Sequence, residues 1–246
     1  PELVGSLKGT LASLERAADG LEGAVADDWP AIAEDLNADR PERARLVFLG
    51  DYLDRGPDSF AVIEWLCAGP PARLFPLPVE MVCLKGNHEA MMLDFLDGGP
   101  LGPVWLINGG RETLESYWEF EGLDYDDREP EETLRRSLAA FLPGEHMSFL
   151  RSLATSHRVG DYYFVHAGVR PDLALADQRE QDQIWIRKPF LEWSNPFEAH
   201  VVHGHTVRAA VDWQPNRTGI DTGAWRSGCL TALVLEGRNR RLIQTA

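Results

Sequence analysis

Long apolar runs are missing from the 246-residue sequence. No stretch approaches the ~18–20 apolar residues that cross a bilayer, so we expect no membrane-spanning helix and no membrane partner. The first residues, Pro1–Val4, have neither the basic head nor the apolar stretch of a secretory signal peptide. Cysteine is also scarce. Cys67, Cys83 and Cys229 are odd in number and never at CxxC spacing, which favours free thiols in a reducing compartment and a cytoplasmic protein.

Positively charged residues are also few. The chain has 24 Lys and Arg against 39 Asp and Glu, for a net charge of −15. Contacts with the phosphates of a nucleic acid need clustered Lys and Arg, so we expect no nucleic-acid partner. A small phosphate ligand can still bind to such a chain where nearby cations outweigh its net negative charge. The 44% share of hydrophobic residues is enough for a buried core and excludes a disordered chain. The length fits a single domain over residues 1–246.

The sequence does contain a recurring unit, a short apolar run that ends in a turn with glycine and polar residues. The runs are rich in β-branched or aromatic residues, which is typical of buried strands. They cover residues 45–49, 80–84, 161–165 and 199–202. A further pair, 228–236 and 241–245, flanks residues 237–240 and predicts a strand pair around a short turn.

Helical spacing of apolar residues lies between the strands. It occurs at 10–21, after Ser59, and at 88–96, 133–142 and 147–153. The alternation of strands and helices indicates an α/β fold. Residues 97–158 show several helix-like pieces and no clear strand, so we expect a helical insertion over one end of the sheet. Within it, residues 119–132 hold eight acidic residues and one base, Arg128. We interpret this segment as a solvated acidic loop or, alternatively, as a lid that filters substrates by charge.

Metal-competent side chains follow four of the predicted strands. They are Asp51, Asn87, His166 and His205. Ligands of open α/β sheets bind at the carboxyl ends of strands, so these four side chains converge if their strands are neighbours. One carboxylate, one amide oxygen and two imidazoles form a mixed N/O set that suits Mn²⁺, Fe²⁺ or Zn²⁺. Each residue alone is common in turns; the prediction rests on all four following strands beside glycine.

A second set of polar residues lies next to these candidate ligands. Asp54 and Arg55 come three and four residues after Asp51, and His88 follows Asn87. An imidazole oriented by a carboxylate fits a general acid that protonates a leaving oxygen, which gives His88 and Asp54 catalytic roles. Arg55 is expected to bind phosphate oxygens in a bidentate manner. Arg187 is a second candidate clamp, although its spacing alone fits a surface ion pair equally well.

These motifs, taken together and in order, resemble those of the phosphoprotein phosphatase (PPP) family of metallophosphoesterases. The matching segments are GDYLDRG at 50–56, GNHE at 86–89, VHAG at 165–168 and GHT at 204–206. GNHEAMM at 86–92 and WIR at 185–187 are most similar to the bacterial branch that includes the bacteriophage lambda phosphatase, with NGG at 108–110 and DTGA at 221–224 in agreement. The similarity runs from about residue 3 to residue 245.

The resemblance implies a four-layer αββα fold with a dinuclear metal centre. In the family, the residue matching Asp51 bridges two ions, and those matching Asn87, His166 and His205 complete the second site. The resemblance also makes His88 the proton donor, paired with Asp54. The two arginines, Arg55 and Arg187, then bind phosphate. It implies hydrolysis of phosphate monoesters by direct attack of a metal-activated water.

The first family motif, Gly-Asp-x-His-Gly, is degenerate in this chain. It matches the segment Val4–Gly9, where Ser6 replaces the aspartate and Lys8 replaces the histidine. A second alignment places Gly5 at the last glycine of the motif and loses the same two ligands. Because a hydroxyl is a weak ligand and a protonated lysine is none, the first site keeps only Asp51, and we expect about one tightly held ion per chain.

Three interpretations of this departure stay open. The protein is an impaired one-metal phosphoesterase, or Lys8 places its ammonium near the vacated site, or the chain is a pseudophosphatase that senses phosphate or binds a partner without turnover. For an active enzyme, the expected partner is a phosphorylated protein or a small phosphate ester. Diadenosine tetraphosphate is an alternative substrate, which the acidic residues 119–132 disfavour. The leading prediction is a metal-dependent, PPP-like phosphatase, with Mn²⁺ ahead of Fe or Zn.

Overall fold

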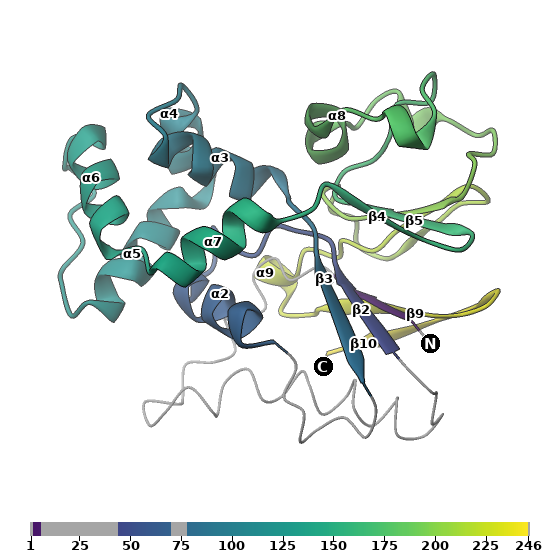
Figure 1. Cartoon of the computed structure of the whole chain (residues 1–246), viewed down its shortest axis with the longest axis horizontal. Helices are drawn as coiled ribbons and strands as arrows, with labels where there is room; N and C mark the ends of the chain where they lie inside the picture. Colours follow the sequence, from purple (N-terminus) through teal and green to yellow (C-terminus); the bar gives the residue numbers. More distant parts are fainter. Residues whose placement is uncertain (1, 6–43, 70–77, 246) are drawn as a thin grey trace.

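Two five-stranded sheets stack face to face in the computed structural model of the chain (Figure 1), which describes residues 2–5, 44–69 and 78–245. The first sheet has the order β10-β9-β1-β2-β3. Its strands are β1 (Glu2–Gly5), β2 (Ala44–Phe48), β3 (Val79–Cys83), β9 (Thr231–Glu236) and β10 (Asn239–Gln244). The strands β1, β2 and β3 are parallel, β9 is antiparallel to β1, and β10 is antiparallel to β9.

The second sheet has the order β4-β5-β6-β8-β7. Its strands are β4 (Ser156–Val159), β5 (Tyr162–Val165), β6 (His200–His203), β7 (Asp212–Trp213) and β8 (Arg217–Gly219). The central strands β5, β6 and β8 are parallel, and both edge strands are antiparallel to their neighbours. Each sheet therefore carries parallel strands whose carboxyl ends point to one edge.

Most helices lie on the outer face of the first sheet (Figure 1). These are α2 (Ser59–Ala68), α3 (Asn87–Leu96), α4 (Gly102–Trp105), α5 (Arg111–Phe120), α6 (Glu131–Phe141) and α7 (Gly144–Ser152), with a π-turn at Leu106–Gly110 between α4 and α5. The second sheet is covered by α8 (Glu180–Trp185) and the 3-10 turns Leu175–Asp177 and Phe190–Glu192. A short helix, α9 (Ala224–Ser227), precedes β9.

The two-residue period of the strands sorts their side chains into separate apolar layers. In β5, Phe164 packs between the two sheets and Val165 packs on the outer face of the second sheet. In β9, Leu233 packs between the sheets while Val234 packs against the helices. Both faces of each sheet are thus buried, which explains why these strands are continuously apolar in the sequence. The result is the αββα sandwich that the resemblance to the PPP family implies.

The predicted strands and the predicted helical insertion agree with this fold, with two corrections. The strandless stretch does not reach residue 158, because β4 begins at Ser156. This strand was missed because its sequence, SHRV, is short, polar and at a sheet edge, where exposure removes the apolar signal. The predicted turn at 237–240 shortens to 237–238, since β10 begins at Asn239.

Some of the other predictions concern residues or functions that the described structure does not test. The predicted helix at 10–21 lies outside them. The acidic segment is exposed loop between α5 and α6, where Asp126 pairs with Arg128, and nothing tests a lid function. Among the described residues, no helix has the length and apolar character to span a membrane.

Candidate active site

Four candidate ligands from separate segments come together at the carboxyl edge of the two sheets. His166 is at the centre of this group. Its Nε2 lies 3.1 Å from the Asn87 Oδ1, 3.2 Å from the His205 Nδ1 and 3.4 Å from the Asp51 Oδ1. All four side chains are buried. Asp51 and Asn87 follow β2 and β3 in one sheet, whereas His166 and His205 follow β5 and β6 in the other, so the site joins the two halves of the sandwich.

The chemistry of these donor atoms fits a bound cation. The His166 Nδ1 lies 2.6 Å from the Leu49 carbonyl oxygen, so this nitrogen carries the proton and donates it. The lone pair of Nε2 then faces a carboxylate oxygen and an amide oxygen, which are acceptors as well. Asp51, His166 and His205 each offer a ligand atom within 4.8 Å of the others. Buried hydrogen-bond acceptors that lie this close to one another are expected where a divalent ion binds between them.

The backbone of the site is held in conformations that side chains seldom adopt. Among the described residues, four non-glycine residues have a left-handed backbone: Asp51 (φ 61°), Asp54 (φ 75°), Arg55 (φ 69°) and His205 (φ 61°). All four belong to the candidate site. Such strain costs about 1–3 kcal/mol per residue and is concentrated at functional sites, so its clustering here supports a functional interpretation.

Glycine is required where the two loops of the first sheet meet. Gly50 has φ 95°, and a Cβ on it would lie 2.5 Å from the Gly86 nitrogen and 3.0 Å from the His166 Nδ1. Any side chain at this position would push the loop of Asp51 away from the loop of Asn87.

Glu89 holds the Asp51 loop in place, a role that the sequence analysis missed. Its Oε2 accepts hydrogen bonds from the Asp51 nitrogen (2.9 Å) and the Gly86 nitrogen (2.7 Å), and its Oε1 accepts one from the Tyr52 nitrogen (2.6 Å). Burial, followed by the nearby Asp51 charge, raises the pKa of Glu89 to about 7. A glutamate three residues after the Gly86 N-cap is the capping-box position, which is the signal that identifies it in the sequence.

His88 and Asp54 form a buried pair beside the ligand group. The His88 Nδ1 lies 2.5 Å from the Asp54 Oδ2, which leaves the His88 Nε2 for a substrate. The helical insertion completes the surroundings of this carboxylate. The Trp105 Nε1 donates to Asp54 at 3.0 Å, and the Thr113 hydroxyl donates at 2.6 Å to the Asp54 Oδ1. Neither Trp105 nor Thr113 was predicted, because a lone tryptophan or threonine in a helical region carries no local motif.

Arg55 lies at the outer side of this pair and is partly exposed. Its Nε donates to the Asn108 carbonyl at 3.2 Å, and its guanidinium lies 5.2 Å from the centre of the Trp225 ring. The adjacent Gly109 has φ 114°, and a Cβ on it would lie 2.6 Å from the Arg55 nitrogen. The backbone of the NGG segment at 108–110 therefore supports Arg55, and the Trp225 ring packs against its guanidinium.

Arg187 is less firmly placed than the other candidates. Its side chain is exposed, and among the described residues no hydrogen bond or ion pair joins it to the rest of the site. Two residues earlier, the Trp185 ring packs edge-on against the His205 ring at 6.3 Å between centroids. The segment that carries Arg187 is thus anchored next to the candidate ligands, while its guanidinium is not. Ser6 and Lys8, on which the degenerate-motif prediction rests, lie outside the described residues.

Comparison with known proteins identifies the family of the chain and several relatives. The family model of the calcineurin-like phosphoesterases matches residues 24–225. The chain is 26% identical to an asymmetrical bis(5'-nucleosyl)-tetraphosphatase, PrpE, of Anoxybacillus flavithermus over 78% of this chain and 76% of the relative. It is 27% identical to serine/threonine-protein phosphatase 1 of Salmonella typhimurium, over 78% of each chain.

A solved structure shows the same fold. The crystal structure of a candidate diadenosine tetraphosphatase superposes with a TM-score of 0.62 at 19% identity, covering 99% of this chain and 92% of that one. At this identity the likeness establishes the architecture alone, whereas the family model covers most of the chain, including every candidate site residue. The chain therefore belongs to the calcineurin-like phosphoesterase family of metal-dependent hydrolases.

Proposed function

We propose that the protein hydrolyses phosphate monoesters, with a phosphorylated protein or a small phosphate ester as substrate. The observation that carries this proposal is the buried group of acceptor atoms around the His166 Nε2, next to the His88–Asp54 pair. A cation site beside an oriented imidazole is what a metal-dependent phosphoesterase needs. Relatives named as protein phosphatases support the same reaction class.

Each candidate residue has a distinct part in this proposal. Asp51, Asn87, His166 and His205 hold the ion, for which Mn²⁺ is our first choice and Fe or Zn the alternatives. A bound divalent ion supplies Lewis acidity and lowers the pKa of water at the site.

His88 donates a proton from its Nε2 to the leaving oxygen, while Asp54 fixes the ring through Nδ1. Arg55 binds phosphoryl oxygens, with Trp225 limiting the orientations of its guanidinium. Arg187 is proposed as a second phosphate clamp that closes on the substrate.

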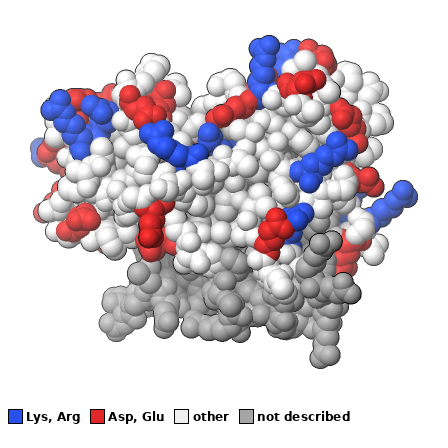
Figure 2. Space-filling model, viewed as in Figure 1, with Lys and Arg blue, Asp and Glu red and all other residues white. Residues whose placement is uncertain are grey.

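The substrate proposal favours monoesters over dinucleoside polyphosphates. The relatives include both protein phosphatases and bis(5'-nucleosyl)-tetraphosphatases, so their names do not decide between the two. The charge of −15 opposes a polyanionic substrate. On the face drawn in Figure 2, the Lys and Arg of the described residues alternate with Asp and Glu rather than forming a basic surface.

A side-by-side assay tests this choice. The purified protein with Mn²⁺ is given p-nitrophenyl phosphate, a phosphoserine peptide and diadenosine tetraphosphate at equal concentrations. We expect kcat/KM to be highest for one of the two monoesters. A higher value for diadenosine tetraphosphate would overturn the substrate proposal, and absence of turnover on all three would favour the alternative below.

The number of bound ions is a separate prediction. Because Ser6 and Lys8 replace two ligands of the first family motif, we expect about one tightly held transition-metal ion per chain, measured by elemental analysis after dialysis. The double substitution Ser6→Asp with Lys8→His restores two ligands and is expected to bring the content toward two and to raise turnover. Two ions at full occupancy in the unchanged chain would contradict this prediction.

A noncatalytic phosphate-sensing or partner-binding protein is the alternative function. The first motif favours it, since two ligands are replaced. The His88–Asp54 pair disfavours it, because a binding protein has no need of a proton donor whose carboxylate partner, Asp54, is itself fixed by Trp105 and Thr113. We further propose a cytoplasmic location, which is supported by the free state of all three cysteines.

A further inference from the structure

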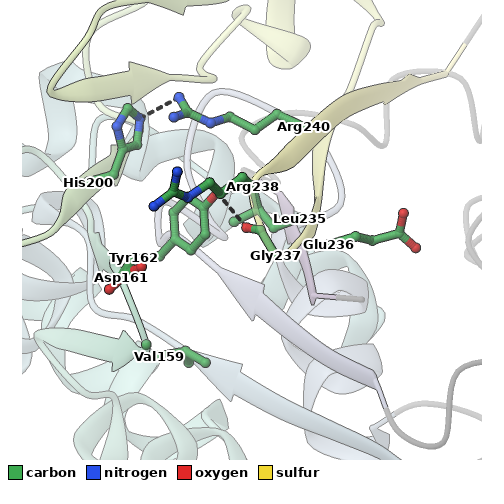
Figure 3. A pocket seen from close by; sticks show the side chains of 10 residues that line it. Val159, Asp161, Tyr162, His200, Leu235, Glu236, Gly237, Arg238 and Arg240 are labelled. Carbon is green, nitrogen blue, oxygen red and sulfur yellow. Dashed lines mark hydrogen bonds between the residues drawn. The ribbon is translucent and has the colours of Figure 1, made fainter.

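A cavity lies at the opposite end of the strands that carry the site histidines. It has a volume of about 540 Å³ and opens between the start of β5 and β6 and the turn of the β9–β10 hairpin (Figure 3). Tyr162 begins β5, whereas His166 follows the end of that strand, so the two places are about 13 Å apart along four residues. The Tyr162 hydroxyl donates to the Gly237 carbonyl at 3.0 Å and ties the hairpin turn to β5.

Arg240 is exposed at the wall of this cavity and contacts two of the other lining residues. Its Nη1 lies 3.0 Å from the His200 Nε2, and its guanidinium lies 6.0 Å from the centre of the Tyr162 ring. Burial, together with the Arg240 charge, lowers the pKa of His200 to about 4, so the imidazole is neutral at pH 7 and accepts a hydrogen bond from Arg240. A neutral partner orients the guanidinium but leaves it cationic, with its other N–H groups available to a ligand.

Arg238 adds a second cation at the same wall. Arg238 lines the cavity together with Arg240, and in the view of Figure 3 both side chains extend toward the side on which His200 lies. No hydrogen bond or ion pair links Arg238 to another described residue. Of the two acidic lining residues, Glu236 points away from the others in Figure 3, and Asp161 lies at the rim beside Tyr162. The cavity is therefore locally positive on a chain whose net charge is −15.

We propose that this cavity is a second binding site, separate from the metal centre, for a small organic anion whose phosphate or carboxylate group is held by Arg238 and Arg240. Two planar guanidinium groups that line one cavity suit the oxygens of such a group, because each guanidinium can bind two oxygens in a bidentate manner. The volume falls within the range of about 300–1,000 Å³ of small-molecule sites and exceeds what a single inorganic ion fills. The proposal stands on the geometry of this end of the sandwich and does not depend on the proposed reaction.

Calorimetric titration of the full chain tests the site with three probes: inorganic phosphate, AMP and citrate. The variant Arg238→Gln/Arg240→Gln removes both cations. We expect the unchanged protein to bind AMP or citrate, and the variant to bind the same probe at least tenfold more weakly, with one binding event lost. Both proteins keep the metal centre, so any binding of these anions there is the same in the two titrations and does not contribute to the difference between them. AMP against citrate separates a phosphate from a carboxylate ligand.

A matched control changes the same charge elsewhere. Arg128→Gln/Arg136→Gln removes two exposed arginines of the helical insertion, each of which pairs with an acid. We expect this variant to bind like the unchanged chain. The single variant Arg238→Gln breaks no hydrogen bond among the described residues, so we expect it to stay folded, which circular dichroism verifies, and to bind the probe more weakly. Equal affinity in all four proteins, or binding of inorganic phosphate alone, would overturn the proposal.

Discussion

Replacing His88 by asparagine is expected to lower kcat for a phosphoserine peptide by about 10²–10⁴-fold, the usual contribution of a general acid, and to lower it less for p-nitrophenyl phosphate, whose leaving group depends little on a donated proton. Asparagine keeps a polar side chain of similar reach but cannot donate a titrating proton. Because the His88 Nδ1 is held by Asp54, the change removes the one ring nitrogen that is left for a leaving oxygen. Metal content is expected to stay unchanged, since the four candidate ligands are other residues.

A second histidine of the same kind provides the control. His146 is buried, its Nε2 lies 3.0 Å from the Glu64 carboxylate and its Nδ1 lies 2.8 Å from the Tyr117 hydroxyl, but it lies among α2, α5 and α7. The variant His146→Asn therefore repeats the chemical change away from the site and is expected to keep kcat. If His88→Asn keeps kcat for the phosphoserine peptide within a few fold of the unchanged chain, the proton-donor role is wrong.

A milder variant, at a residue that hydrogen-bonds to Asp54, tests the same proton-donor role. Thr113→Val removes a hydroxyl that both accepts from the Asp54 nitrogen (2.9 Å) and donates to its carboxylate (2.6 Å). We expect a smaller fall in kcat than for His88→Asn, and a larger fall for alkyl than for aryl phosphates, because poor leaving groups depend more on the proton. An equal fall on both would indicate general damage rather than lost proton transfer.

The four candidate ligands were predictable because each follows a strand at its carboxyl end. An apolar run, a glycine and a polar residue in that order identify Asp51, and a polar residue directly after an apolar run identifies His166. The parallel pairing of β2 with β3 and of β5 with β6 brings such positions to one edge. The α/β class and the helical insertion follow from the same alternation of apolar periods.

The remaining features depend on contacts between distant segments. Nothing local in the sequence divides the strands between two sheets, because strands of both sheets are apolar on both faces. Trp105 and Thr113 reach Asp54 across 51 and 59 residues, and a lone side chain in a helix gives no sign of such a partner. The polar strand β4 is recognised only through its pairing with β5.

Replacing His166 by alanine is expected to abolish tight metal binding, from about one ion per chain to less than a tenth of that, because its Nε2 lies within 3.4 Å of a donor atom of each other candidate ligand. Phosphatase activity is expected to fall by about a thousandfold or more. This factor assumes that the catalytic metal lowers the activation free energy by about 4 kcal/mol, and each tenfold change in rate corresponds to about 1.4 kcal/mol.

The control for this prediction is a histidine that is equally buried and close in sequence to His205. The His203 ring packs edge-on against Phe190 at 5.0 Å, and its Nε2 lies 3.3 Å from an Arg217 nitrogen, so its contacts are on the outer face of the second sheet. His203→Ala is expected to lose stability but to keep its metal. Elemental analysis of both variants, with circular dichroism to verify folding, separates the two effects. Full metal content in a folded His166→Ala protein would show that the ion binds elsewhere, and the proposed reaction would then lose its site.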